Sequence, residues 1–376
     1  MVLFVYNNKS YFIVSTIDAN FGGSEWLWYK TAILLKSLGC DVTVYLSFYK
    51  SNIHLNKLLS LGIKLEYGTP PPRRIWRRFT DFIESKHFNL AAAIERVQPD
   101  ITLISMGNHI ESSFFSSQFN ALPEPYILLP QLVMPIYVSS DSFIYHRSIF
   151  ENAEKVCFVS LENRHQCEVD LGLDLSATSV IVGNAFVEYD IVNTAAPPPW
   201  KVAVPARLDF YQKGQDILLR ALVELRGCLN DLEVHFYCDD PLRRILRFAT
   251  LHRLTNVFVH PHQAMEKVLT DNHAVLLPSR FEGMSLSMLE AMFAGLPVFA
   301  TPVAGVSEVI VDGVNGFVAE SISVYGVQKL LLRAYESRFS WAAMGQAGAN
   351  ILRSKSIRKA EDKLAEILFK TCSRQD

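Results

Sequence analysis

Short runs of apolar and β-branched residues alternate with stretches of helical periodicity along almost the whole chain. Runs of about four to eight such residues are typical of strands that are buried on both faces of a sheet. In the first half the predicted strands cover residues 11–17, 41–47, 100–105, 125–130, 155–160 and 179–186. In the second half they cover 201–207, 233–238, 256–260, 274–279, 297–301 and 316–319. Strands that alternate with helices predict parallel sheets and an α/β fold.

The segments between the predicted strands have helical patterns. From Ser24 to Leu38 the leucines share one helical face, and Gly39 follows, where a helix commonly ends. Further helices are expected from about residue 215 to 225 and from near Ser285. The chain therefore opens with a strand, a Gly-Gly pair, a helix and a second strand, which together make a βαβ unit.

Length and prolines divide the chain into domains. A chain of 376 residues suits two domains. The proline-rich stretch "NTAAPPPWK" can neither continue a helix nor pair in a central strand, so it is the expected linker. We expect domains at 1–195 and 196–352, followed by a C-terminal helical segment, 353–376, that packs back on the first domain. Parallel sheets bind ligands at the carboxyl ends of their strands, so two such domains would face each other across a binding cleft.

Composition excludes several classes of protein. The chain is 49% hydrophobic and 20% charged, which is typical of a globular protein, and its net charge of −2 gives no overall positive field for nucleic acid. The six cysteines are scattered without a CxxC pair, which favours reduced thiols in a cytoplasmic protein. The first twenty residues lack a basic leader. The longest apolar region, 125–138, is shorter than the roughly 20 residues that span a membrane.

Two carboxylates lie in the otherwise apolar block "SRFEGMSLSMLEAMFAGLPVFATP". Glu282 follows the predicted strand 274–279, and Glu290 lies in the helix that begins near Ser285. A helix N-terminus offers unpaired N–H groups to a ligand, and a carboxylate beside it can accept hydrogen bonds from sugar hydroxyls. The alternative is that Glu282 is a loop charge and Glu290 a helix-surface residue.

Two cations, Arg207 and Lys213, lie in "PARLDFYQKGQDILLRAL". Arg207 ends the first predicted strand of the second half, and Lys213 precedes the next helix. A guanidinium and an ammonium beside a helix N-terminus can neutralise a diphosphate without a metal ion. The alternative is that Arg207 pairs with Asp209 and that Lys213 is solvated.

A glycine pair and several missing motifs complete the pattern. Gly22 and Gly23 would let a ligand approach the backbone after the first strand. The sequence contains no GxGxxG after a strand, no D-x-D, no HExxH and no GxxxxGK[ST]. His260 and His262 lack an obvious third ligand, so no metal site and no cofactor are expected.

These residues together resemble a known family. The segment from Leu277 to Val318, with "ARLDFYQKG" upstream and "GGSEW" near the start, is similar to the retaining glycosyltransferases of family four. The resemblance implies a GT-B fold, with two Rossmann-like domains facing across a cleft. It also implies an acceptor-binding first domain and a second domain that binds a nucleotide-sugar donor.

The resemblance assigns roles to single residues. Glu282 matches the glutamate that holds hydroxyls of the donor sugar, and Glu290 the one that binds the ribose. Arg207 and Lys213 match the cations that stabilise the departing diphosphate, so Glu282, Arg207 and Lys213 are the expected catalytic residues. The remaining expected donor contacts are Gly23, Gly283, Met284, Ser285, Leu286, His260 and Gln263.

The sequence departs from the family where acceptor chemistry is expected. Pro130 and Gln131 stand where the family often has a histidine. The resemblance places Gln131, Asn108 and His109 on the acceptor side. The expected acceptor is a carbohydrate or a lipid-linked glycan, and transfer passes through an oxocarbenium-like state that requires stabilisation of the leaving diphosphate.

A basic segment precedes residue 80. "PPPRRIWRRF" gathers Arg73, Arg74, Arg77 and Arg78 around two aromatic residues. This composition suits peripheral contact with an anionic membrane surface on its inner face. The alternative is a solvated helix start after a proline loop.

Two other functions stay open. One is a sugar-nucleotide epimerase on the same fold, which is expected to lack the combination of Arg207, Lys213, Glu282 and Glu290. The other is a protein that binds a sugar nucleotide without turnover, which the departure at Pro130 and Gln131 would allow.

Overall fold

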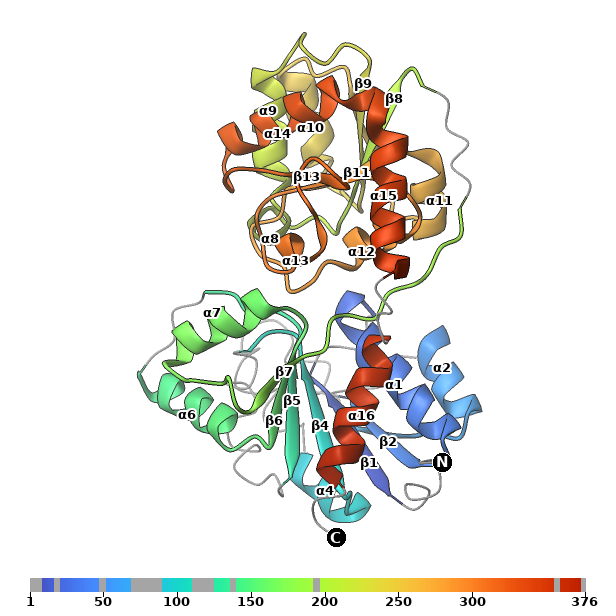
Figure 1. The fold of residues 1–376 in the computed structure, drawn as a ribbon, viewed down its shortest axis with the longest axis vertical. Helices are drawn as coiled ribbons and strands as arrows, with labels where there is room; N and C mark the ends of the chain where they lie inside the picture. Colours follow the sequence, from blue (N-terminus) through green and yellow to red (C-terminus); the bar gives the residue numbers. More distant parts are fainter. Residues whose placement is uncertain are drawn as a thin grey trace. The chain divides into compact units, whose positions relative to one another are not determined.

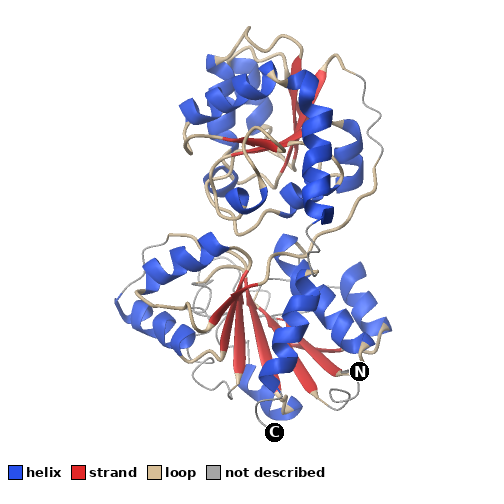
Figure 2. Ribbon diagram, in the orientation of Figure 1, coloured by secondary structure: helices blue, strands red, loops and turns tan. Residues whose placement is uncertain are grey.

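The computed structural model describes residues 9–16, 21–46, 52–68, 90–109, 125–135, 140–191, 197–354 and 359–372. The chain forms two compact units (Figure 1). The first comprises Met1–Ala185 with Arg358–Asp376, and the second comprises Phe186–Ile357. In each unit helices cover a central sheet (Figure 2), which is the α/β architecture that the sequence predicts.

The first unit contains, among its described residues, a seven-stranded parallel sheet. In spatial order its strands are β3 (Lys64–Tyr67), β2 (Asp41–Leu46), β1 (Ser10–Ser15), β4 (Ile101–Met106), β5 (Tyr126–Pro130), β6 (Lys155–Phe158) and β7 (Ser179–Ile181). Its helical segments are η1 (Gly23–Glu25), α1 (Trp26–Ser37), α2 (Ile53–Ser60), α4 (Leu90–Val97), α6 (Ser140–Glu151), α7 (Leu161–Leu171) and α16 (Ala360–Cys372).

The side chains of neighbouring residues in β1 point to opposite faces of this sheet, as the two-residue period of a strand requires. The ring of Phe12 joins the core cluster that also holds Ile94 of α4 and Cys167 of α7. The ring of Tyr11 instead meets Phe369 of α16, with ring centroids 5.9 Å apart. The C-terminal helix α16 also packs on α1 and thus belongs to the first unit.

The second unit contains a six-stranded parallel sheet within the described residues. In spatial order its strands are β10 (Val257–His260), β9 (Leu232–Tyr237), β8 (Trp200–Pro205), β11 (Ala274–Leu277), β12 (Val298–Ala300) and β13 (Gly316–Val318). Its helical segments are α8 (Phe210–Lys213), α9 (Gln215–Glu224), α10 (Arg244–Leu251), α11 (Met265–Asp271), α12 (Leu286–Phe293), α13 (Val306–Val309), α14 (Val324–Glu336), η3 (Arg338–Ser340) and α15 (Trp341–Ser354).

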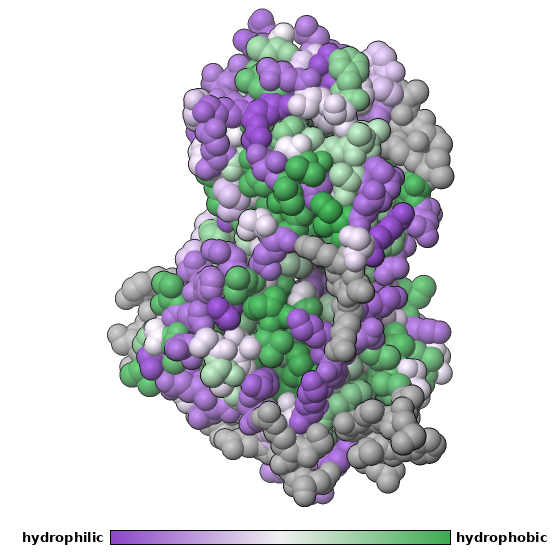
Figure 3. Space-filling model, viewed as in Figure 1, coloured by the Kyte–Doolittle hydropathy of each residue, from purple (hydrophilic) through white to green (hydrophobic). Residues whose placement is uncertain are grey.

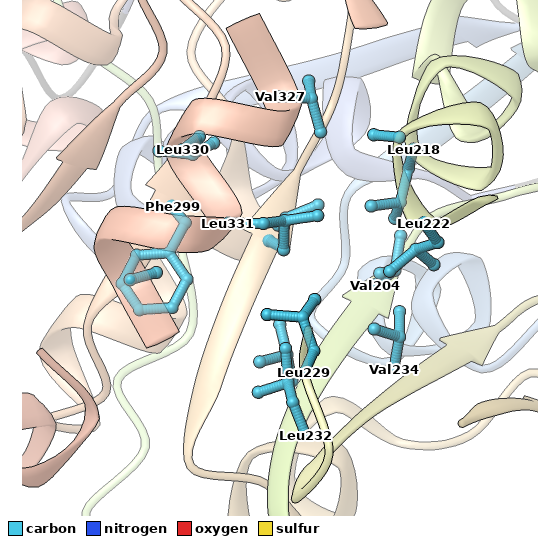
Figure 4. Packing of buried hydrophobic residues seen from close by; sticks show 14 of the residues in the cluster. Val204, Leu218, Leu222, Leu229, Leu232, Val234, Phe299, Val327, Leu330 and Leu331 are labelled. Atoms are coloured by element: carbon cyan, nitrogen blue, oxygen red, sulfur yellow. The ribbon is translucent and has the colours of Figure 1, made fainter. Parts of the chain in front are cut away.

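Helices α9 and α14 cover one face of the second sheet. Figure 4 shows their leucines meeting over side chains of the strands, with Leu222 of α9 and Leu331 of α14 near Val204 of β8. Met288 of α12 and Leu269 of α11 pack in a different cluster on the opposite face. Polar side chains cover much of the surface of each unit on the face drawn in Figure 3.

All twelve predicted strands are present, and the structure adds β3. The sequence did not indicate β3 because this edge strand, "KLEY", is only partly buried and has no continuous apolar run. The first unit ends at Ala185 rather than at residue 195. Phe186, Tyr189 and Ile191 pack against the core of the second unit, which is why the division precedes the prolines.

Each sheet has one point where the strand order reverses. In the first unit β1 pairs with β2 and with β4. In the second unit β8 pairs with β9 and with β11. Open α/β sheets bind ligands outside the carboxyl ends of the strands at such a point. The loops that follow β8 and β11 are therefore the first place to look for a site in the second unit.

The contact between α15 and the end of α12 depends on Gly345. A methyl group at this position would lie 1.8 Å from the carbonyl oxygen of Gly295, whereas one at Gly348 in the same helix would lie 3.5 Å from the flexible end of Met292. We expect Gly345→Ala to lower the free energy of unfolding by about 1–3 kcal/mol, because backbone atoms must move apart. The matched variant Gly348→Ala should leave the free energy of unfolding unchanged or raise it by up to about 1 kcal/mol. Urea unfolding of both variants tests this, and equal effects would contradict the packing described here.

Candidate active site

The loop after β8 lies against the end of β11. Asp209 caps α8, since its carboxylate accepts a hydrogen bond from the backbone N–H of Gln212 at 3.0 Å. Gly214 ends α8 with φ +64°, and a Cβ there would lie 1.9 Å from the carbonyl oxygen of Pro278. Only glycine permits this approach without backbone movement. The approach brings Lys213 to the loop that carries Glu282.

Lys213 and Glu282 form a largely buried ion pair. Lys213 Nζ lies 2.8 Å from Glu282 Oε1, and the two side chains are 15% and 9% exposed. The hydroxyl of Ser279 donates a second hydrogen bond to the same oxygen at 2.7 Å. Both bonds end on Oε1, so Oε2 is the carboxylate oxygen to which the described residues make no hydrogen bond. The structure thus brings two of the three expected catalytic residues together.

The side chain of Arg207 is 66% exposed and pairs with Asp209, which is the alternative that the sequence left open. Its Nη2 atom lies 3.2 Å from Asp209 Oδ2 and also donates to the side-chain oxygen of Gln212. The side chain of Gln212 in turn donates to the backbone oxygen of Phe281 at 3.4 Å. Gln212 therefore connects Arg207 to the loop after β11, a role that no pattern in the sequence indicates.

A second ion pair fixes the same loop. Arg280 donates to both carboxylate oxygens of Asp216, in the first turn of α9, at 2.8 and 2.7 Å. Hydrogen bonds from Arg280 hold the pKa of Asp216 below its ordinary value. Thr301, after β12, donates to the backbone oxygen of Ser279 at 2.5 Å. The sequence interpretation missed these residues, although polar residues directly after a predicted strand are a usable signal.

Glu290 is 7% exposed, so it is not a helix-surface residue. Its Oε1 atom accepts a hydrogen bond from the backbone N–H of Val187 at 3.4 Å. Burial raises the pKa of Tyr189, and the nearby charge of Glu290 adds to this effect. Glu290 therefore faces the segment that follows Ala185 and packs on α12.

The turn at Gly305 presses on the segment before α12. Gly305 has φ +78°, and a Cβ there would lie 3.0 Å from the oxygen of Gly283 and 3.1 Å from Cα of Met284. Ser285 is the N-cap residue of α12, without a hydrogen bond from its side chain to the helix, and Leu286 is the first helical residue. The expected donor-binding backbone thus forms the segment that leads into α12 and the first residue of that helix.

His260 lies at the end of β10 in a chain of three polar side chains. Glu233 Oε2 is 3.0 Å from His235 Nε2, and His235 Nδ1 is 2.9 Å from His260 Nε2. Burial lowers the pKa of both histidines, so both rings are neutral near pH 7. A carboxylate only accepts, so His235 donates from Nε2 and accepts at Nδ1, and His260 donates from Nε2. The Nδ1 atom of His260 is therefore a hydrogen-bond acceptor.

Gln263 follows β10 and carries a second acceptor. Its Oε1 atom is buried and has no hydrogen-bond partner among the residues that the structure describes. Buried polar atoms are normally paired, so this oxygen is a candidate contact for a ligand N–H group. Within the described part of the chain no group of three potential metal ligands converges.

The remaining expected residues lie in the first unit. Gly23 begins η1, where the carboxylate of Glu25 accepts from the backbone N–H of Gly22 at 2.9 Å. Asn108 and His109 follow β4, and Gln131 directly follows β5.

Arg73, Arg74, Arg77 and Arg78 lie outside the described residues. None of the helices in the described ranges has the length and apolar character needed to cross a bilayer.

Comparison with known proteins gives matches to sugar-transferring proteins. Residues 200–336 match the family model described as glycosyl transferases group 1. Glycogen synthase of Thermus thermophilus is 33% identical over 175 residues, which cover 43% of this chain and 40% of that protein. A GDP-mannose-dependent phosphatidylinositol monomannoside mannosyltransferase of Mycolicibacterium smegmatis is 29% identical over 170 residues, 42% of this chain and 44% of that protein. The chain thus aligns with about two fifths of the length of these relatives.

Solved structures show the same fold over nearly the whole chain. HepE of Anabaena, solved with UDP and glucose, superposes with a TM-score of 0.73 at 16% identity and covers 96% of this chain and 100% of its own. Sucrose-phosphate synthase of Thermosynechococcus elongatus gives a TM-score of 0.76 at 12% identity, with coverage of 98% and 100%. With its two parallel-sheet units, the chain has the GT-B fold, as the sequence predicts.

The close approach at Gly214 can be tested against a glycine of similar backbone conformation. Gly227 has φ +85°, and no described atom lies within 4 Å of where its Cβ would be. Gly227→Ala should therefore cost only the left-handed strain of about 1–2 kcal/mol. Gly214→Ala should cost about 1–3 kcal/mol more and separate Lys213 from Glu282, because the added methyl meets Pro278. Denaturant unfolding and a crystal structure of Gly214→Ala check both points, and an intact ion pair in that variant would contradict the role given to Gly214.

Proposed function

We propose that the protein is a retaining, metal-independent glycosyltransferase, because residues 200–336 match the model of the glycosyl transferases group 1 family and the chain has a GT-B fold. It moves a sugar from a nucleotide-sugar donor to a hydroxyl of a carbohydrate or lipid-linked acceptor. The observation that carries this proposal is the buried pair of Lys213 and Glu282 beside the point where the strand order reverses.

The pair suits a sugar joined to a phosphate. Lys213 has three N–H donors, one of which points to Glu282, so two are left for phosphate oxygens. Glu282 has Oε2 left to accept from a sugar hydroxyl. Because the two side chains touch, the groups that they bind are neighbours in the ligand. A sugar phosphate presents hydroxyls and phosphate oxygens in this way.

The chemistry requires stabilisation of the leaving diphosphate. Cleavage of the donor develops positive charge on the sugar and negative charge on the departing phosphate. Lys213 is held in place before the reaction, so it costs little reorganisation when this charge appears. Arg207 is exposed and can exchange Asp209 for phosphate oxygens, with its planar fork donating two hydrogen bonds. With these two cations the proposed mechanism needs no metal ion.

Further residues fit the nucleotide. His260 Nδ1, at the end of β10, and Gln263 Oε1, after it, are acceptors that are proposed to receive N–H groups of the base. Glu290 is proposed to bind the ribose. The backbone from Gly283 to Leu286 is proposed to bind the sugar and the phosphates. Gly23 of the first unit is proposed to approach the donor. Relatives supply two donor chemistries for testing, since HepE was solved with UDP-glucose and the mannosyltransferase is described as GDP-mannose-dependent.

The two alternative functions, an epimerase and a protein that only binds a sugar nucleotide, predict different products. An epimerase would convert the sugar of the donor without releasing nucleoside diphosphate. A protein that only binds would retain the donor unchanged. A transferase releases nucleoside diphosphate when an acceptor is present.

Donor turnover with a panel of nucleotide sugars and acceptors tests the function. We expect Glu282→Ala and Lys213→Ala to lower kcat by at least about 100-fold, as loss of a preorganised charge does elsewhere. Each variant also leaves a buried charge unpaired, so the free energy of unfolding is measured alongside turnover.

Lys329→Ala and Glu320→Ala are the matched controls, since this ion pair in the same unit is exposed. They should keep the parent rate. Parent-like turnover by Lys213→Ala or Glu282→Ala would refute the site, and donor binding without nucleotide release would refute transfer.

The same proposal includes peripheral membrane contact through Arg73, Arg74, Arg77 and Arg78. The four cations and the adjacent aromatic residues would bind anionic headgroups. Sedimentation with vesicles should show binding that rises with the content of anionic lipid and that is lost when the four arginines are replaced by glutamine. Equal sedimentation with neutral vesicles would refute this contact.

A further inference from the structure

Aromatic rings from three segments of the first unit meet beside Gly22 and Gly23, which we call the glycine pair. Phe21 directly precedes the pair. Trp26 and Tyr29 lie in the first turn of α1, and His54 lies in the first turn of α2. The segment that carries the glycine pair is therefore in contact with two helices through side chains.

The ring of His54 contacts the other three rings. It stacks on the ring of Phe21, with centroids 4.2 Å apart and planes inclined by 24°. It meets Trp26 and Tyr29 at centroid distances of 5.1 and 5.5 Å, with planes close to perpendicular. Stacked and perpendicular arrangements at these distances are the favourable ones for aromatic pairs. His54 thus joins the residue before the glycine pair to α1 and α2.

The ring of His54 stacks as an uncharged group. Burial lowers the pKa of His54, so the imidazole is neutral near pH 7. Tyr29 is 7% exposed, and the rings of Phe21, Trp26 and His54 are half-buried. A phenylalanine at position 54 would offer a flat ring to the same neighbours, whereas an alanine would remove the contact.

The glycine pair is held at its other end by a hydrogen bond. The backbone N–H of Gly22 donates to Glu25 Oε2 at 2.9 Å, and both glycines are exposed. Glycine loses more conformational freedom on ordering than any other residue, so an exposed glycine pair stays ordered only if its flanking residues hold it. The stacking of Phe21 on His54 fixes the pair on one side, and Glu25 fixes it on the other.

A loop that is ordered before binding gives a higher affinity, because the loss of its freedom does not oppose association. We propose that His54 is a positioning residue that keeps the glycine pair in the conformation that binds the donor, by stacking on Phe21. The inference rests on the proposed function, in which Gly23 approaches the nucleotide sugar. It adds a residue of α2 that has no polar contact to offer the donor in this role and acts through the packing of rings.

Three variants separate positioning from stability. His54→Ala removes the ring, and His54→Phe keeps one of similar size. Leu58→Ala is the matched control, because Leu58 is fully buried in the same helix, α2, and its loss also lowers the free energy of unfolding. Only His54→Ala should loosen the glycine pair.

Loop order is measured first, by amide hydrogen exchange on the full chain without donor. We expect the N–H of Gly22 to exchange at least about tenfold faster in His54→Ala than in the parent chain, because its hydrogen bond opens more often. Its exchange should stay within about twofold of the parent rate in His54→Phe and Leu58→Ala.

Donor affinity is measured next, by calorimetry with a panel of nucleotide sugars. His54→Ala should bind the preferred donor at least about fivefold more weakly, whereas His54→Phe and Leu58→Ala should stay within about twofold of the parent affinity. Parent-like exchange in His54→Ala, no recovery in His54→Phe, or an equal loss of affinity in Leu58→Ala would overturn the inference. So would a faster exchange in His54→Ala that leaves donor affinity unchanged. A parent chain that binds no nucleotide sugar would refute the proposed function together with the inference, a result distinct from any failure confined to the His54 variants.

Discussion

The ion pair between Lys213 and Glu282 holds together two loops that belong to different crossovers of the second sheet. It forms because Gly214 lets the end of α8 touch the backbone at Pro278, where no larger residue fits. Two charged groups are costly to bury, and their mutual contact together with the hydroxyl of Ser279 offsets that cost. The proposed ligand chemistry of this unit depends on this contact, since it fixes an ammonium and a carboxylate side by side.

The supporting residues increase the rigidity of the same edge. Gln212 connects the exposed Arg207 to the loop after β11, and the fork of Arg280 on Asp216 fixes that loop to α9. At the edge strand β10, the chain from Glu233 through His235 to His260 orients an imidazole. Charged and strongly polar groups thus gather at this edge of the second sheet, which suits the proposed binding of a diphosphate and a base.

The sequence predicted the strands because both faces of a parallel sheet are buried, which leaves continuous apolar runs. It failed at β3, where an edge position removes that pattern, and at the division between the units. The role of Phe186 could not be read locally, since it depends on packing against residues about a hundred positions later. The motif led us to predict Glu282, Lys213 and Glu290 as site residues, and this stays a prediction. Gln212 and Arg280 were missed, because hydrogen bonds between segments 69 and 64 residues apart leave no periodicity in the sequence. Ser279 was missed although it lies only three residues before Glu282, which accepts its hydrogen bond.

The most direct measurement is a crystal structure of the chain with a nucleoside diphosphate sugar bound. We expect phosphate oxygens within hydrogen-bond distance of Lys213 Nζ and of the Arg207 guanidinium, with a sugar hydroxyl on Glu282 Oε2 and the Lys213–Glu282 contact retained. A diphosphate bound away from the loops after β8 and β11, with Arg207 still on Asp209, would contradict it.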